Sequence, residues 1–403
     1  MNEKEIVDIE THYLANVFSK RPVVITRGKG ALLWDINGKE YVDCSSSYGV
    51  AALGHCHPKV VAAVKAQAEE LITCHSCYYN DKRAEFIEKL VAITPKGLDK
   101  AFLSNSGAES VECAIKLARK YTGKTEIIAL MGAFHGKTMG ALSATWDKKY
   151  REPFMPLIPD IKHVAPDNAD KIREAITEKT AAVLMEPIRG EGGVRVPPDG
   201  YLKSVREICD EKNVLLIFDE VQTSFGRTGK LFGCQNWGVT PDVMCLAKPF
   251  AGGLPIGITV AKENIMSALK VGEHSTTFSG NPMVCAAGCA AIDALLEEKL
   301  ADKAAVNGKY FKFQLEALQA KHKIIKEVRG LGLMLGMELR FDVHDIILRA
   351  LDRGVLVLDA GRTVVRLLPP LVIEKAQIDK AIAVLDTVLG EEENERASSP
   401  VSN

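Results

Sequence analysis

The chain of 403 residues is 47% hydrophobic, enough apolar material for one large domain and a smaller companion. Its 51 lysine and arginine residues nearly balance 52 acidic residues, and the net charge of −1 argues against nucleic acid or an anionic membrane as a partner. No apolar run is long enough to span a bilayer, and ten scattered cysteines without a short disulfide framework favour free thiols in a cytoplasmic protein.

The first segment of the chain predicts a helix followed by a β-hairpin. After a helix-like stretch near the N-terminus, residues 31–44 (ALLWDINGKEYVDC) alternate apolar and polar side chains. The dipeptide Asn37-Gly38 lies at the centre of this stretch and is a strong signal for a two-residue hairpin turn. We therefore expect an antiparallel strand on either side of it.

From about residue 100 the pattern changes to short apolar runs that alternate with helical periodicity. Segments 109–121 and 200–212 have the spacing of amphipathic helices. Six runs predict buried strands, at 101–105, 125–131, 181–187, 214–220, 242–247 and 257–261. This alternation is typical of an α/β protein with a mostly parallel sheet covered on both faces.

The rest of the chain predicts a smaller α+β domain. A long amphipathic helix is expected from Pro282 to Leu318, followed by short strands and a final helix at 374–389. The tail is charged and rich in serine, so we expect disorder there. The predicted organisation is an N-terminal segment that packs with the small domain, a large domain, a small domain and a disordered tail, at residues 1–45, 46–285, 286–390 and 391–403.

Charged side chains stand at the ends of three predicted strands, where ligands bind in open α/β sheets. Asp219 and Lys248 end neighbouring runs, and Glu186 ends an earlier one. A buried amine and a buried carboxylate must each be paired or used, because an unpaired buried charge is costly. One chemistry needs both groups: lysine forms an imine with pyridoxal phosphate, and a carboxylate keeps the pyridinium nitrogen protonated. The turn at 106–108 opens a helix, so its free backbone N–H groups suit a phosphate.

A series of motifs resembles the class III pyridoxal-phosphate-dependent aminotransferases. The similarity covers essentially the whole chain before the tail and rests on GHCHPKV, NSGAES, GAFHGKTMGALSAT, EPIRGEGG, DEVQTSFGRTGK, LAKPFAGGLPIG, TTFSGNP and VRLLPPLVI. It implies the pyridoxal-phosphate-dependent transferase fold of type I, with pyridoxal 5'-phosphate bound in the large domain. It also implies a homodimer with its active sites at the subunit interface.

Position by position, the resemblance implies roles for individual residues. Lys248 corresponds to the Schiff-base lysine, which also moves protons as general base and acid, and Asp219 corresponds to the partner of the pyridine nitrogen. Thr277 corresponds to the threonine that reaches the phosphate in the neighbouring subunit. The other implied cofactor contacts are the phosphate cradle Ser106, Gly107 and Ala108, the ring-stacking Phe134 with Val221 on the opposite face, Gln222 at the phenolic oxygen, and His135.

The resemblance also implies how two kinds of substrate use one site. Arg366 in VVRLLPPL resembles the arginine that binds an α-carboxylate with both prongs, and Glu191 in EPIRGEGG resembles the carboxylate that pairs with it. When Glu191 pairs with Arg366, the arginine is neutralised and an ω-amino donor can enter. When Glu191 is displaced, Arg366 binds glutamate or 2-oxoglutarate. Glu186 is predicted to belong to the same substrate-binding group.

Within the family, RGLGLMLG and residues 354–373 are most similar to the acetylornithine aminotransferases, including the archaeal type that also serves lysine synthesis. The implied reaction moves the terminal amine of N-acetylornithine, or of a related blocked diamino acid, to 2-oxoglutarate, giving a semialdehyde and glutamate. Lys137 stands in FHGKT where those enzymes carry an arginine for the donor's distant carboxylate, and Pro249-Phe250 replace the usual small residues. Tyr48 lies where ornithine aminotransferases place a specificity tyrosine.

Alternatives of three kinds stay open: another donor, another outcome and a metal site. FHGKT with LSAT also resembles putrescine aminotransferases, so ornithine, putrescine and 4-aminobutyrate-type donors are kept. An amino-acid racemase that uses pyridoxal phosphate shares most of these motifs, whereas a non-catalytic scaffold should have lost Lys248, Asp219 or the phosphate turn. We expect no metal, because no common zinc spacing is matched by His55, Cys56, His57, Cys74, His75 and Cys77.

Overall fold

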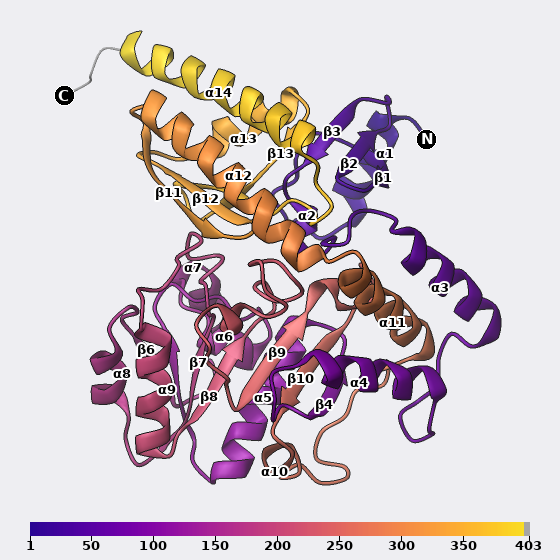
Figure 1. Ribbon diagram of the computed structural model, residues 1–403, viewed down its shortest axis with the longest axis vertical. Helices are drawn as coiled ribbons and strands as arrows, with labels where there is room; N and C mark the ends of the chain where they lie inside the picture. The colour runs from indigo at the N-terminus through magenta and orange to yellow at the C-terminus, as the bar shows by residue number, and fades with distance from the viewer. Residues whose placement is uncertain (399–403) are drawn as a thin grey trace.

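The computed structural model describes residues 1–398, and its lower half in Figure 1 is a seven-stranded sheet with the helices that cover it. The strands of this sheet are β4 (Lys100–Ser104), β5 (Glu126–Leu130), β6 (Ile161–Val164), β7 (Thr180–Met185), β8 (Leu215–Asp219), β9 (Val243–Ala247) and β10 (Gly257–Ala261). They lie in the order β4-β10-β9-β8-β7-β5-β6, and β10 alone among them runs antiparallel to its neighbours. The predicted mostly parallel α/β sheet is therefore confirmed.

All six strands predicted for this region are present, because the central strands are buried on both faces and read as unbroken apolar runs. The sheet has one further strand, β6, which the sequence did not predict. β6 is an edge strand of four residues with only Val164 fully buried, so its sequence IKHV carries little apolar signal.

Helices follow the strands of this sheet. They are α5 (Gly107–Thr122), α6 (Met139–Ala144), α7 (Lys148–Arg151), α8 (Ala169–Ala175), α9 (Tyr201–Lys212) and α10 (Glu263–Met266), with 3-10 turns η1 (Glu152–Phe154), η2 (Gly233–Asn236) and η3 (Lys248–Ala251). Both predicted helices, α5 and α9, are present. The side chain of Ser106 caps α5 by accepting the N–H of Glu109 at 3.2 Å, and Gly123 ends the helix with φ of +69°.

The N-terminal part of the chain forms the predicted hairpin and then crosses to the large sheet. Its elements are α1 (Glu3–Tyr13), β1 (Ile25–Lys29), β2 (Leu32–Asp35), β3 (Glu40–Asp43), α2 (Ser46–Gly49), α3 (Pro58–Glu70) and α4 (Asp81–Ile93). β2 and β3 pair around the turn at Asn37-Gly38, where Gly38 has φ of +83°. The C-terminal strand β13 (Val355–Leu356) pairs in parallel with β3 and completes a sheet in the order β1-β2-β3-β13.

The last sheet and the last three helices occupy the upper part of Figure 1. The strands are β11 (Ile325–Leu331), β12 (Met334–Leu339), β14 (Leu358–Ala360) and β15 (Val364–Leu367), in the order β11-β12-β15-β14. The helices of the C-terminal part of the chain are α11 (Pro282–Glu297), α12 (Leu300–Lys321), α13 (His344–Asp352) and α14 (Lys375–Ser398). None of the helices within residues 1–398 is long and apolar enough to cross a membrane.

The single long helix predicted from Pro282 to Leu318 is wrong: α11 and α12 are separate helices. Lys299 lies between them with φ of +52°, a conformation that ends a right-handed helix. α11 packs against α3 and α4, whereas α12 packs against β11 in the other part of the molecule. One straight helix could not bury its apolar face against both neighbours, so the chain turns between them.

Disorder from residue 391 onward is also wrong for the described part of the tail, because α14 continues to Ser398. The high charge of residues 391–398 predicted disorder, but their carboxylates form ion pairs with basic side chains of earlier elements. These ion pairs join Glu391 to Arg353, Glu393 to His322 and Glu395 to Arg349. Residues 399–403 of the predicted tail lie outside the described residues.

Candidate active site

A cavity of about 420 Å³ opens where β4, β8 and β9 end. It brings together most of the residues that the sequence singled out, although they come from six separate segments. The predicted residues that line it are Ser106, Gly107, Ala108, Phe134, His135, Glu186, Glu191, Asp219, Val221, Gln222 and Lys248.

Lys248 lies at this cavity directly after β9, as the first residue of η3. Its backbone has φ of +54°, a strained conformation for a residue with a side chain, and Pro249 follows it with a fixed φ. Burial lowers the pKa of Lys248 from 10.5 to about 8, although the nearby carboxylate of Glu191 opposes this. Part of the amine is therefore neutral, and nucleophilic, near neutral pH.

The atypical Phe250 has a packing role. Its fully buried ring lies edge-on to Phe225 at 5.0 Å and stacked near Phe232 at 6.4 Å, between ring centroids. The turn that follows Lys248 is thus anchored in the core of the large domain, which holds the amine in place.

Asp219 ends β8, next to β9 in the sheet, and is buried. One carboxylate oxygen, Oδ1, accepts the N–H of Val221 at 3.0 Å and so caps the turn after the strand. The other, Oδ2, lies 2.7 Å from Nδ1 of His135. The backbone N–H of His135 donates to Oγ1 of Thr145 at 2.9 Å, so the histidine itself is held in register. Asp219 is therefore oriented from both sides.

Glu186 follows β7 and is buried at the back of the cavity. Oε1 accepts the N–H of Phe134 at 3.1 Å, and Oε2 accepts the N–H of Gly190 at 2.9 Å. Burial raises the pKa of Glu186 to about 7, and the charge of Asp219 adds to the rise. Each oxygen accepts one backbone N–H, which fixes the carboxylate of Glu186 at the cavity wall, and its role in substrate binding stays a prediction.

The turn at Ser106, Gly107 and Ala108 is the start of α5, where the first backbone N–H groups have no acceptor inside the helix. A β-carbon on Gly107 would lie only 2.9 Å from Cγ1 of Val221, so this position requires glycine. The positive end of the helix dipole and the free N–H groups make the turn a cradle for an anion such as phosphate.

Arg366 is fully buried on β15, and its Nη1 donates to Oε1 of Glu191 at 2.6 Å and to Oε1 of Gln222 at 3.3 Å. Its Nε and Nη2 are buried and find no partner within residues 1–398. The half-exposed ring of Tyr48 lies 5.5 Å from the guanidinium carbon of Arg366. The predicted pair of Arg366 and Glu191 is thus in contact, and two further nitrogens of the arginine are buried without a partner among the described residues.

Four of the predicted residues are not part of the cavity lining. Arg366 contacts the lining residues Glu191 and Gln222, and Tyr48 lies beside Arg366. Lys137 is exposed, and its Nζ lies 4.8 Å from the ring centroid of Tyr150 instead of lining the cavity. Thr277 is exposed and also lies outside the lining of its own chain's cavity. The cavity has in addition lining residues that the sequence did not single out, although most of them lie inside or beside the quoted motifs: Val50, Asn105, Gly136, Ala247, Gly253, Leu254, Pro255 and Ile256.

Two of the three histidines considered as metal ligands have carboxylate partners, and Nδ1 of His75 accepts the N–H of Cys77 at 3.2 Å. Nε2 of His55 lies 2.7 Å from Oδ2 of Asp43, and Nε2 of His57 lies 2.9 Å from Oε1 of Glu298. Across the described chain, no three or more His, Cys, Asp and Glu side chains converge in a way that could hold a metal ion.

The cavity has the features that pyridoxal phosphate requires. It offers an amine with a lowered pKa, a fixed carboxylate, an anion cradle at a helix start and the flanking side chains of Phe134 and Val221. The fold and this site together define a pyridoxal-phosphate-dependent enzyme of fold type I, in which the cofactor would be held by Lys248, Asp219 and the turn at Ser106.

Comparison with known proteins places the chain in a family. The model of the family Aminotransferase class-III matches residues 13–389, so the chain belongs to the class III aminotransferases and uses pyridoxal phosphate. It is 47% identical to an acetylornithine aminotransferase of Methanocaldococcus jannaschii, over 97% of this chain and 99% of that protein. It is 46% identical to a [LysW]-aminoadipate semialdehyde transaminase of Deinococcus radiodurans, over 96% and 91%.

A solved structure with the same fold is an ornithine aminotransferase of Toxoplasma gondii, which has partial occupancy of PLP at its active site. The TM-score is 0.95 at 35% identity, covering 98% of this chain and 96% of that one. The chain is therefore an aminotransferase, and the racemase and scaffold alternatives are set aside.

Proposed function

We propose that this protein transfers the terminal amine of N-acetylornithine, or of a related blocked diamino acid, to 2-oxoglutarate. The observation that carries the proposal is the contact between Arg366 and Glu191. An arginine neutralised by a displaceable carboxylate suits an enzyme that must accept an ω-amine in one half-reaction and an α-carboxylate in the other. The names of the relatives at 46–47% identity support the same substrate class.

The residues of the cavity divide the chemistry among them. When bound, pyridoxal phosphate takes up the donor's amino group and withdraws electrons from the substrate carbon. The amine of Lys248, with its pKa near 8, acts as the nucleophile and then carries a proton as base and acid. Asp219 would present its carboxylate to the ring nitrogen of the bound cofactor and favour its protonated form, and His135 holds Asp219 in position. We assign Phe134, Val221 and Gln222 to ring contacts.

The unpaired N–H groups of Arg366 support a role in recognising the second substrate. Nη1 is occupied by Glu191, but Nε and Nη2 have no partner among the described residues. A glutamate carboxylate that approaches this fork can form two parallel hydrogen bonds and displace Glu191, whose side chain is 29% exposed and has room to move. The ring of Tyr48 lies 5.5 Å from the guanidinium carbon on the outer side of this pair.

An alternative donor is putrescine, and one observation favours it. The Nζ of Lys137 packs over the ring of Tyr150, and Lys137 does not line the cavity. The cation of the FHGKT motif is therefore not directed at the place where a donor carboxylate would bind. A diamine without a carboxylate would need no such cation.

Glu191→Gln tests the switch. The variant keeps the size of the side chain but removes the negative charge that neutralises Arg366, so the ω-amine half-reaction should slow relative to the glutamate half-reaction. Stopped-flow absorbance of the holoenzyme with each substrate gives this ratio. An unchanged ratio would show that Glu191 does not govern substrate exchange.

We also propose that the protein is a homodimer in which Thr277 contributes to the partner's phosphate cradle. Thr277 is exposed beside Phe278, which is 68% exposed, and Tyr79 is wholly exposed on a neighbouring loop. Arg83 joins the two loops, because its guanidinium donates to the carbonyls of Gly280 at 2.8 Å and Cys74 at 2.7 Å. Exposed aromatic side chains on a braced surface are typical of a subunit interface. A cytoplasmic location remains a prediction.

Mixing inactive subunits tests this assembly. Neither Lys248→Met nor Thr277→Ala homodimers should be active at limiting cofactor. In a mixed dimer, the site that contains the Lys248→Met change would also receive the Thr277→Ala change from the partner. The other site would contain Lys248 and receive Thr277, so activity should return. Absence of recovery in dimers shown to be mixed by mass would place Thr277 at its own chain's site.

A further inference from the structure

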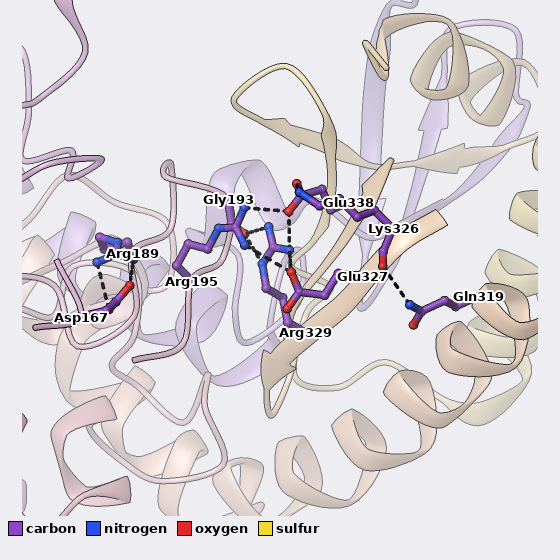
Figure 2. A network of polar contacts seen from close by, with 9 residues as sticks. All are labelled: Asp167, Arg189, Gly193, Arg195, Gln319, Lys326, Glu327, Arg329 and Glu338. Atoms are coloured by element: carbon purple, nitrogen blue, oxygen red, sulfur yellow. Dashed lines mark hydrogen bonds and ion pairs between the residues drawn. The ribbon is translucent and has the colours of Figure 1, made fainter. Parts of the chain in front are cut away.

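The loop that carries Glu191 is a short hairpin held at both ends. Its ends pair with each other, because the N–H of Arg195 donates to the carbonyl of Arg189 at 3.0 Å and the reverse bond measures 3.2 Å. Inside the loop, Gly193 and Val194 have φ of +101° and +53°. On the large-domain side the loop is fixed by Arg189, whose Nη2 lies 2.8 Å from Oδ2 of Asp167 (Figure 2). Glu191 therefore sits on a tight, defined turn.

The opposite side of the loop is clamped by Arg329 of β11. Its Nε and Nη2 both donate to the carbonyl of Gly193, at 2.8 and 2.6 Å (Figure 2). Its Nη1 donates to Oε2 of Glu338 at 2.7 Å, and Nη2 of Arg195 reaches the same carboxylate oxygen at 2.7 Å. The loop is thus bound, through its backbone and a side chain, to the sheet β11-β12-β15-β14, which we call the small sheet. The bound carbonyl of Gly193 is two residues away from Glu191.

The same small sheet carries Arg366. In the pairing of β12 with β15, Gly336 lies opposite Arg366 and Glu338 lies opposite Val364. Val194 packs on this surface, since a β-carbon on Gly336 would lie 3.0 Å from Cβ of Val194. A rigid sheet therefore holds both the arginine of the switch and the platform for its glutamate.

The clamp is built from buried, fully paired groups. Arg329 is 7% exposed and Glu338 is 5% exposed. Burial alone would raise the pKa of Glu338, but its contacts with Lys326, Arg329 and Arg195 lower it to about 2. Lysine at position 329 could not reproduce a two-pronged grip on one carbonyl together with an ion pair, because it presents a single ammonium.

We propose that Arg329 is a positioning residue that holds Glu191 against Arg366 and so sets the balance between the two half-reactions. The inference rests on the proposed switch. With the clamp intact, the resting enzyme keeps Arg366 neutralised and ready for an ω-amine. With the clamp loosened, Glu191 leaves Arg366 more often, and the site shifts toward glutamate.

The test is Arg329→Lys in the holoenzyme, with Arg349→Lys as the matched control. Arg349 pairs with Glu395 on the far side of the small domain and does not touch the loop. The ratio of the ω-amine rate to the glutamate rate should fall by about fivefold or more in Arg329→Lys, a size typical of coupled neighbouring groups. It should stay unchanged in Arg349→Lys. An unchanged ratio in folded Arg329→Lys holoenzyme would overturn the proposal, since an equal loss in both rates is what a merely structural role of Arg329 predicts.

A double-mutant cycle shows whether Arg329 acts through Glu191. In a Glu191→Gln background, Arg329→Lys should have no further effect on the ratio. Equal effects in both backgrounds would overturn the proposal. Glu338→Gln, which keeps the shape of the clamp, should shift the ratio in the same direction if Arg329→Lys folds poorly. If the wild-type ratio is measurable but Glu191→Gln does not change it, the proposed switch itself fails, which is a different outcome from failure of the clamp alone.

Discussion

Replacing Lys248 with methionine should stabilise the cofactor-free protein at neutral pH while it abolishes activity. Burial is the main cause that lowers the pKa of this amine from 10.5 to about 8. A protonated Lys248 therefore destabilises the folded state relative to the unfolded state. The difference between the two pKa values corresponds to about 3 kcal/mol of unfolding free energy, which Lys248→Met should recover. This penalty is almost fully present at pH 7, where Lys248 is mostly protonated in both states.

The pH dependence distinguishes this effect from a gain in apolar packing. Between pH 8 and 10.5 the folded state loses its proton before the unfolded state does, so the advantage of Lys248→Met should shrink and vanish near the upper value. Urea unfolding of the apo forms at pH 7, 9 and 10.5 measures this, with the exposed Lys148→Met as control. A variant no more stable than wild type at pH 7, or equally stabilised at every pH, would refute the reasoning.

Two further changes test the cofactor site. Asp219→Asn should lower kcat by about a hundredfold to a thousandfold at full cofactor occupancy, because a charge fixed at the reacting centre is lost; an unchanged rate in holoenzyme verified by absorbance would contradict its role. Gly107→Ala should weaken pyridoxal phosphate binding by about tenfold in Kd, since the new methyl group would press on Val221. Fluorescence titration of the apoprotein measures this, and Gly390→Ala, whose β-carbon meets nothing closer than 3.8 Å, should bind normally.

Much of the cofactor site could be predicted from the sequence because it depends on local patterns. Buried central strands read as apolar runs, and the charged residue that ends each run then falls at the edge of the sheet where ligands bind. This reasoning placed Asp219 and Lys248 at one cavity, and the cap at Ser106 marked the start of α5.

Other features depend on contacts between distant segments, which no local pattern reports. The bond from Arg329 to Gly193 joins residues 136 positions apart, and neither residue belongs to a recognisable pair in the sequence. Lys137 belongs to a motif of the cofactor site, yet its side chain turns outward to Tyr150. No glycine or proline marks the break at Lys299 in the sequence. The turn results from the two surfaces on which α11 and α12 pack.

The most direct test of the central claim is the rate at which each amine bleaches the holoenzyme's cofactor absorbance. N-acetylornithine, ornithine, lysine, putrescine and 4-aminobutyrate are mixed in turn with the enzyme in a stopped-flow instrument. Our account expects fast bleaching by N-acetylornithine and slow bleaching by putrescine, with absorbance restored by 2-oxoglutarate. Fast bleaching by putrescine and none by N-acetylornithine would contradict it.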